Sequence, residues 1–286
     1  FDPDQGVVHR YAAMGDSASI IVSPDNQIWV GSASGGLSII NPETHEIQTQ
    51  EIDPEHPYKL SSRRIQTLMR GGSGHIWIGT ADAGLLSVDL RKQNHLTFIQ
   101  RSGPQSIPAG PIHVVFEDSL GYIWAGSYIG GLARIDPVFN DIRQYTHRAG
   151  DFFSISGDHI STMIEDGSGR IWIGTDQGPA LYISEIDGFE PPGIMMEGWP
   201  DFQGRHVLAM AESPNGAIWM SLRSGDFYKL DPMEREFVRF RFTPASVPSV
   251  MVVDSFGTLW AGSRRTLRIF NGEGPLVKNW LPVGTD

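Results

Sequence analysis

A short motif built around tryptophan recurs six times along the chain, and it constrains the fold more than any other feature. Its copies read QIWVGS, HIWIGT, YIWAGS, RIWIGT, AIWMSL and TLWAGS. Their tryptophans are spaced 48, 47, 48, 47 and 41 residues apart, at Trp29, Trp77, Trp124, Trp172, Trp219 and Trp260. A period of this length is too long for a solenoid of strand-and-turn units, and it fits a four-stranded propeller blade.

Each repeat divides into four strands, as the third copy illustrates. An apolar run ends in a turn at Asp118–Gly121, and the tryptophan strand follows at Tyr122–Ser127. A third strand is expected at Leu132–Asp136 and a more polar fourth strand at Ile142–His147. β-branched and aromatic residues fill the runs, while Gly, Pro, Asn and Asp fill the joints. No window of ten residues has helical periodicity, so the sequence predicts an all-β propeller of four-stranded antiparallel blades.

The residues around each tryptophan have physical explanations. A Gly or Asn lies three residues before it, where a hairpin turn requires a left-handed backbone. Asp118, Asp166 and Asp254 begin three of these turns, and we expect their carboxylates to accept backbone N–H bonds. We predict that the six indoles fill the space between neighbouring blades, with the glycine two positions later allowing close approach.

This pattern resembles the two-component regulator propeller repeat, in which Ser-Leu-Ser precedes an apolar strand and Asp-x-x-Gly-x-Ile-Trp-Ile-Gly-Thr follows. The best matches are residues 154–175, 119–137 and 60–80. The fifth repeat departs at Ser221, and the sixth has Arg264 and Arg265 where two glycines are expected. The resemblance implies the periplasmic sensor domain of a membrane-bound regulator, whose output module is a histidine kinase or a diguanylate cyclase.

Six complete blades occupy residues 16 to about 284, and a segment remains in front of them. Residues 1–11 align without gaps on residues 135–145, which predicts that they form the outer strand of another blade. We therefore expect seven blades in a longer parent chain, with six closed blades as the alternative. Residues 1–286 are predicted to form a single propeller domain.

Composition excludes several classes of protein. The chain contains no cysteine, so it has neither a disulfide framework nor a thiolate metal site. Its net charge of −11 repels phosphate backbones, which argues against nucleic acid as a partner. No apolar run approaches the roughly 20 residues of a membrane helix, so we expect no membrane contact by this segment. We also expect no cofactor and no metal.

The candidate binding residues follow from the repeat register. In a propeller, the loops that enter each innermost strand and the loops that follow each tryptophan strand share one face. At these positions the repeats differ, which leaves the residues available for function; Asp82, Asp176 and Arg265 are among them. The predicted ligand-binding residues are Arg64, His113, Tyr128, Asp158, His159, Arg205, His206, Arg223 and Arg264. Arginines, a carboxylate and a tyrosine suit a sugar or a carboxylated ligand.

Catalysis has little support in the sequence. Neither His-x-His nor His-x-x-x-His occurs, and there is no Gly-x-Ser-x-Gly elbow. Two alternatives stay open beside the sensor: a propeller lyase or glycan-active enzyme with His159 or His206 as general base, and a protein-binding scaffold. The resemblance implies a small-molecule or oligosaccharide ligand and a homodimer formed through the parent receptor.

Overall fold

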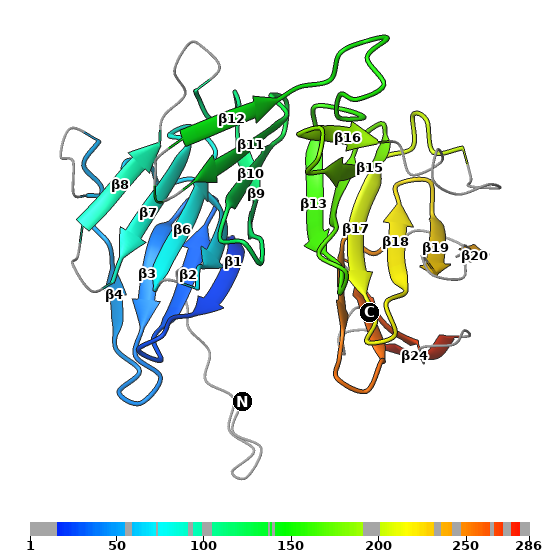
Figure 1. The fold of residues 1–286 in the computed structure, drawn as a ribbon. Helices are drawn as coiled ribbons and strands as arrows, with labels where there is room; N and C mark the ends of the chain where they lie inside the picture. Colours follow the sequence, from blue (N-terminus) through cyan, green and yellow to red (C-terminus); the bar gives the residue numbers. More distant parts are fainter. Residues whose placement is uncertain are drawn as a thin grey trace. The chain divides into compact units, whose positions relative to one another are not determined.

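The computed structural model describes residues 16–54, 59–72, 74–90, 94–98, 105–136, 138, 141–190, 201–231, 236–241, 247–263, 266–270 and 276–280. These residues form six four-stranded antiparallel sheets and no helix (Figure 1). The predicted all-β propeller architecture is confirmed. The predicted outer strand at residues 1–11 lies outside the described residues.

The first three sheets follow the chain in order. They contain β1 (Ser17–Val22), β2 (Ile28–Ser32), β3 (Gly36–Ile40) and β4 (Ile47–Thr49); β5 (Ile65–Arg70), β6 (His75–Thr80), β7 (Leu85–Asp89) and β8 (Asn94–Phe98); and β9 (Ile112–Glu117), β10 (Ile123–Ser127), β11 (Leu132–Asp136) and β12 (Asp141–Tyr145).

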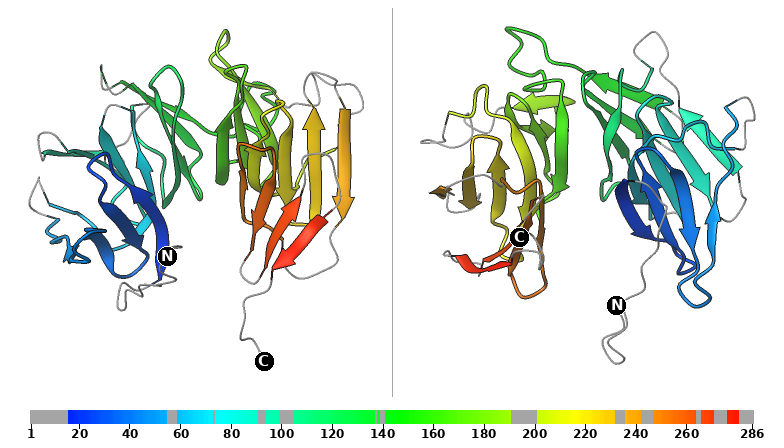
Figure 2. Two further views of the ribbon diagram at one scale, coloured as in Figure 1. Left: turned by 90° about the horizontal axis from the view of Figure 1, so that it is seen from below. Right: turned by 180° about the vertical axis from the view of Figure 1, so that it is seen from behind.

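The last three sheets have the same order of strands. They contain β13 (Ile160–Glu165), β14 (Ile171–Thr175), β15 (Gly178–Ile183) and β16 (Gly188–Glu190); β17 (Val207–Glu212), β18 (Ile218–Leu222), β19 (Asp226–Asp231) and β20 (Glu236–Arg241); and β21 (Val250–Val253), β22 (Leu259–Gly262), β23 (Leu267–Phe270) and β24 (Leu276–Trp280). The left view of Figure 2 shows the strands of the last two sheets in yellow to red.

The chain divides into two compact units. The first unit contains residues 1–99 and 111–115, and the second contains residues 100–110 and 116–286. The division therefore falls within β9, between residues 115 and 116. The expectation that residues 1–286 form a single domain stays a prediction.

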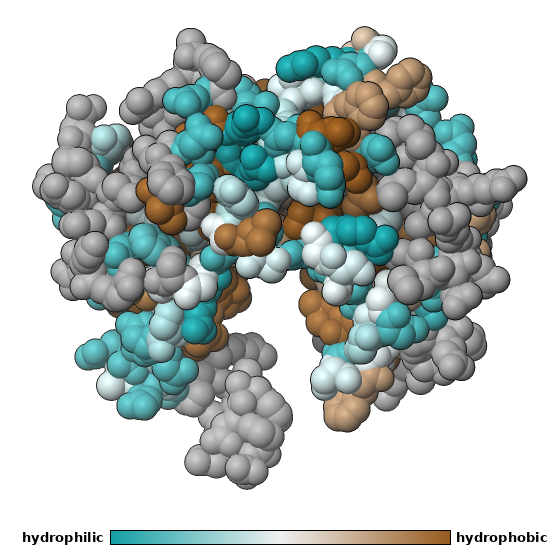
Figure 3. All heavy atoms as spheres, in the orientation of Figure 1, coloured by the Kyte–Doolittle hydropathy of each residue, from teal (hydrophilic) through white to brown (hydrophobic). Residues whose placement is uncertain are grey.

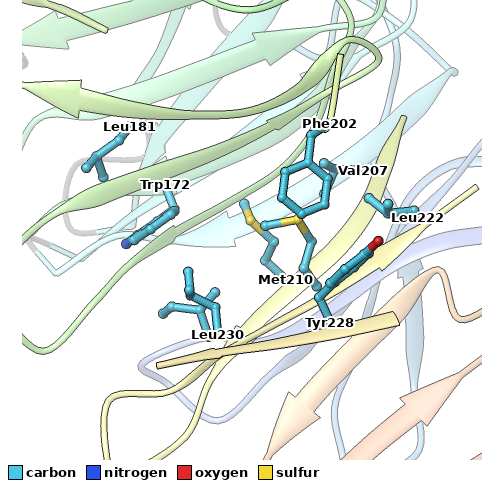
Figure 4. Close-up of a cluster of buried hydrophobic side chains, with 10 residues drawn as sticks. Trp172, Leu181, Phe202, Val207, Met210, Leu222, Tyr228 and Leu230 are labelled. Carbon is cyan, nitrogen blue, oxygen red and sulfur yellow. The ribbon is translucent and has the colours of Figure 1, made fainter. Parts of the chain in front are cut away.

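Packing between neighbouring sheets builds the core of the second unit. In Figure 4, Trp172 and Leu181 of one sheet lie against Met210 and Leu230 of the next. Trp172 pairs with Leu181 in the strand register, so the two side chains share one face. A Cβ on Gly174, two positions after Trp172, would lie 2.8 Å from Val207 of the next sheet. The predicted close approach at this glycine is therefore confirmed.

Five of the six tryptophans are buried, and the sixth is not. Trp124, Trp172 and Trp219 are wholly inaccessible, whereas Trp260 is 37% exposed. The Trp219 face is covered by the β21–β24 sheet, but within the second unit no described sheet follows β21–β24. The prediction of a buried indole is wrong at Trp260 because no described sheet of its own unit packs against this face.

The tight turns that begin with aspartate form the predicted backbone hydrogen bonds and one further bond to the tryptophan side chain. The Asp166 Oδ1 accepts N–H bonds from Ser168 and Arg170, at 3.0 and 3.1 Å. These bonds confirm the expected turn, and Gly169 takes the left-handed φ of 77°. In addition, the Trp172 indole donates to Asp166 Oδ2 at 2.8 Å. Asp118 and Asp254 hold Trp124 and Trp260 in the same way.

Glutamates at the ends of two innermost strands join neighbouring sheets. The Glu165 carboxylate accepts the Ser119 backbone N–H at 2.7 Å, and Glu212 accepts that of Gly167 at 2.7 Å. Each bond links a turn to the last residue of the next sheet's first strand. The edge of the sheets that carries these turns, which we call the turn edge, is thereby a repeated framework.

Candidate ligand-binding site

A cavity of about 870 Å³ opens at the opposite end of the strands, within the second unit. The loops β10–β11, β12–β13 and β14–β15 and the segment before β17 form its walls. We call this the loop-edge pocket. Of the predicted residues, Tyr128, Asp158 and His159 line it. Loops of successive blades therefore converge as the repeat register predicts.

Three predicted residues form a row of rings beside the pocket. The Tyr128 and His159 ring centroids are 4.1 Å apart, and those of His159 and His206 are 4.6 Å apart. The three residues come from three neighbouring blades. The row fixes the orientation of His159 in the pocket wall and leaves Tyr128 45% exposed.

His206 lies at the buried end of this row. Its Nε2 is inaccessible and has no hydrogen-bond partner in the part of the chain that the structure describes. Burial, with smaller effects of His159 and Arg223, lowers the pKa of His206 to about 4. Asp176 opposes this shift, which places its charge near the imidazole. His206 is therefore neutral at neutral pH, and Nε2 is withheld from any proton transfer with a ligand in the pocket.

Asp158 supports the loops around the pocket. Its Oδ1 accepts the His147 backbone N–H at 2.7 Å, and its carbonyl accepts the Gly131 N–H at 2.9 Å. Asp158 thus joins both ends of the β12–β13 loop and ties them to β11 of the preceding sheet. Asp158 therefore positions the β12–β13 loop, which forms most of the pocket wall.

Asp176 also lines the pocket, in the loop after β14. Its Oδ1 is buried, and it has no hydrogen-bond partner among the described residues. This oxygen lies against Gly157, where an added Cβ would approach it to 2.4 Å. Buried carboxylate oxygens are normally hydrogen-bonded, so the desolvated carboxylate of Asp176 is stabilised by a positive charge that enters the pocket.

Neither Arg205 nor Arg223 lines the pocket. The Arg205 guanidinium lies 3.5 Å from Asp226, a buried carboxylate that also accepts hydrogen bonds from Arg239. Arg223 is exposed. The expectation that these arginines receive a carboxylated ligand stays a prediction; among the described residues, Arg148 is the arginine that lines the pocket.

The remaining predicted residues lie elsewhere. Arg64 and His113 belong to the first unit, and Arg264 lies outside the described residues. Arg64 is exposed, with its backbone N–H donated to Ser62 Oγ at 2.8 Å. His113 is half-buried, and burial lowers its pKa.

The β12–β13 loop supplies residues that the sequence pattern did not identify. Phe152 lines the pocket with 73% of its side chain exposed, and Ile129 of the β10–β11 loop lines it with 62% exposed. Figure 3 shows apolar side chains at the surface where β16 and the β12–β13 loop lie in Figure 1. Adjacent phenylalanines at 152 and 153 in an otherwise polar loop were the available signal.

Metal-binding and membrane-spanning features are absent from the part of the chain that the structure describes. These residues contain no group of three or more His, Asp or Glu side chains arranged to hold a metal ion. Nor do they contain a helix with the length and apolar character needed to cross a membrane.

Comparison with known proteins finds similarity to a propeller repeat and to a histidine kinase. The family model described as "two component regulator propeller" matches residues 154–177. Histidine kinase P4 of Formosa agariphila is 30% identical over 263 residues. This match covers 88% of the chain but 19% of the kinase, so the chain spans about a fifth of that relative's length.

Solved structures show the same fold. The extracellular domain of a hybrid two-component system of B. thetaiotaomicron gives a TM-score of 0.69 at 16% identity, covering 99% of this chain and 41% of that one. An inactive variant of virginiamycin B lyase from Staphylococcus aureus, solved with quinupristin, also gives 0.69 at 16% identity. That match covers 96% of this chain and 87% of the lyase.

Proposed function

We propose that this chain, a propeller of the two-component regulator type, is the ligand-sensing domain of a membrane-bound histidine kinase. It binds a small molecule or oligosaccharide in the loop-edge pocket. The observation that carries the proposal is the convergence of loops from neighbouring blades around a cavity with exposed rings. The recognised repeat at residues 154–177 and the kinase relative support the signalling role.

The pocket has the size and composition of a ligand site. Its volume of about 870 Å³ lies within the usual range for small-molecule pockets. Tyr128 and Phe152 offer exposed aromatic faces, on which the apolar face of a sugar ring or another cyclic ligand can stack. Gln177 and Asp176 add hydrogen-bonding groups to the same wall. An apolar platform with a few polar groups gives both affinity and orientation.

Signalling follows from differential binding. A ligand held by loops of neighbouring blades favours the receptor arrangement in which those loops keep the bound geometry. The shift between arrangements cannot exceed the ligand's preference for one of them. We propose that the parent receptor is a periplasm-facing homodimer, since the outputs of such regulators act in pairs. A diguanylate cyclase is the alternative output module.

A lyase or glycan-active enzyme is the second candidate. The observation in its favour is that His159 lines the pocket, where it could act as a general base. His206 is unsuited to that role, because its Nε2 is buried. If the wild-type chain forms product and His159→Ala loses this activity while it retains ligand affinity, the enzyme function is established. If the wild-type chain binds a ligand without converting it, the sensor function is supported.

A thermal-shift screen of the chain tests the sensor proposal. The library contains oligosaccharides, amino acids, amines and organic acids. A ligand that binds only the folded state stabilises it by about 2.7 kcal/mol at a hundredfold excess over Kd. We expect a hit whose affinity falls at least tenfold in Tyr128→Ala/Phe152→Ala.

Phe256→Ala is the matched control, because Phe256 is an exposed aromatic residue of a turn and lies outside the pocket lining. A hit that retains full affinity in the Tyr128/Phe152 variant would place the binding site elsewhere and overturn the proposal.

A further inference from the structure

The walls of the loop-edge pocket carry an excess of negative charge. Among the described residues, four carboxylates line it, those of Asp151, Asp158, Asp176 and Asp201, against one guanidinium, that of Arg148. The formal charge of these five groups is −3. Because the mouth of a cavity focuses the field of its lining charges, this excess acts on whatever enters.

Three of the four carboxylates have no cationic side chain beside them. Among the described residues, no Lys, Arg or His nitrogen lies within 4.0 Å of a carboxylate oxygen of Asp158, Asp176 or Asp201. Asp151 meets Arg148 only at 3.9 Å, with the arginine side chain 72% exposed. The negative charge of the pocket is thus left for a ligand to balance.

Nearby cations do not cancel this charge. Arg205 is directed to Asp226, where Arg239 also binds. Arg223 influences His206 but does not line the pocket. His206 lies behind His159 with its Nε2 inaccessible, and because burial lowers its pKa to about 4 it adds no positive charge at neutral pH.

The most constrained of the carboxylates is that of Asp176. Its Oδ1 has lost water without gaining a hydrogen-bond donor from the described residues. Gln177 Nε2 donates to the other oxygen, Oδ2, at 3.3 Å, and the inaccessible Oδ1 acts on a ligand through its charge and not through direct contact. Tyr128 and Phe152 in the same pocket present aromatic faces. Such faces attract cations, and they also pack against apolar groups.

From these observations we propose that the loop-edge pocket selects a ligand bearing an ammonium group next to an apolar or ring face, and rejects carboxylated and sulfated ligands. This inference rests on the proposed function, since it names the ligand class of the same pocket. Charge repulsion with the unpaired aspartates excludes anionic ligands, and the aromatic faces hold the body of the ligand.

The field at the pocket can be measured without knowing the ligand. Two nitroxides of matched shape, aminomethyl-PROXYL and carboxy-PROXYL, are added in turn to the isotope-labelled chain. Paramagnetic relaxation is then read at the side chains of Tyr128, Ile129 and Phe152. We expect the cationic probe to relax these protons at least about threefold more than the anionic probe. A ratio of one or below would overturn the proposal.

Variants assign the effect to the pocket aspartates. Asp201→Asn removes an exposed lining charge, and Asp176→Asn removes the one with the buried oxygen. Each should lower the probe ratio. Glu185→Gln makes the same change of charge at an exposed site outside the pocket lining and should leave the ratio unchanged. An equal effect of all three variants would show that the overall charge of the chain is responsible, which contradicts the proposal.

The thermal-shift hits complete the test. Hits that depend on Tyr128 and Phe152 should be amines, and their N-acetylated forms should bind at least about tenfold more weakly. A carboxylated hit with the same dependence would overturn the ligand class while supporting the sensor function. A preference for the cationic probe without any pocket-dependent hit would support the selectivity and overturn the proposed function, so the two failures are distinct.

Discussion

The turn edge and the loop edge lie at opposite ends of the same strands in the blades of the second unit. Residues at the turn edge repeat from blade to blade, whereas residues at the loop edge vary. At the turn edge, Asp118, Asp166 and Asp254 repeat one arrangement, in which a carboxylate holds the indole six residues later. At the loop edge, the residues before each innermost strand differ from blade to blade. The comparison teaches that residues which recur with the repeat form the framework, while those that interrupt it form the pocket.

Breaking the turn edge should have the largest effect. Asp166→Ala leaves the buried Trp172 indole and two backbone N–H groups without their acceptor. We expect a loss of on the order of 3 kcal/mol in the free energy of unfolding, measured by urea denaturation. Ser168→Ala, at an exposed position of the same turn, is the control. A loss below about 0.5 kcal/mol would show that the indole bond is not part of the framework.

At the loop edge, His206 should make stability depend on pH. Its pKa of about 4 in the folded chain lies below the usual 6.5, so the unfolded chain binds more protons between these values. Stability should fall as pH falls from about 6.5 towards 4, by on the order of 1 kcal/mol after allowance for solvent screening. His206→Gln should remove this part of the pH dependence of Tm. An identical Tm profile for both chains would contradict the assignment.

The first unit offers a test by repair. Trp29 occupies the repeated position, but no described residue forms a hydrogen bond with its buried Nε1. Residue 23, six positions before it, is serine. The Ser23 hydroxyl bonds instead to Gln27 and Asp25. Ser23→Asp should supply the missing acceptor and raise the free energy of unfolding by roughly 0.5–1 kcal/mol. An unchanged or lower stability would show that the turn cannot be transferred between blades.

The smallest effect on stability is expected in the pocket. Phe152 is 73% exposed, so Phe152→Ala should change the free energy of unfolding by less than about 0.5 kcal/mol. The same substitution should still weaken ligand binding, which separates the pocket from the framework. A loss of stability comparable to that of Asp166→Ala would remove the distinction between the two edges.

The sequence predicts the framework well because the framework is repeated. Trp172 and Gly174 are identified by their phase, and the turn at Asp166 by its composition. The indole bond was not predicted, although the spacing of six residues was visible, because the distance between side chains across a hairpin depends on the twist of its strands. The burial of Trp260 was predicted wrongly, because burial depends on a neighbouring sheet and not on the strand itself.

The pocket could be predicted only in part. The repeat register predicted that Tyr128, His159 and His206 lie close together, because each position is fixed by the end of a strand. The position of a residue in the repeat gives no information about the course of the β12–β13 loop. Hydrogen bonds accepted by Asp158 and Asp151 set this course; Asp151 Oδ1 accepts the Phe153 N–H at 3.0 Å. The position of Arg205 in the repeat also does not show that its guanidinium pairs with Asp226 and not with a group in the pocket.

The central claim is that ligand binds at the loop edge of the second unit and leaves the turn edge unchanged. Amide hydrogen exchange of the chain, with and without the hit from the screen, tests it most directly. The account predicts slower exchange across residues 147–159, with no change across the turn at residues 166–169. Protection confined to the turn edge, or absent from residues 147–159 at saturating ligand, would contradict it.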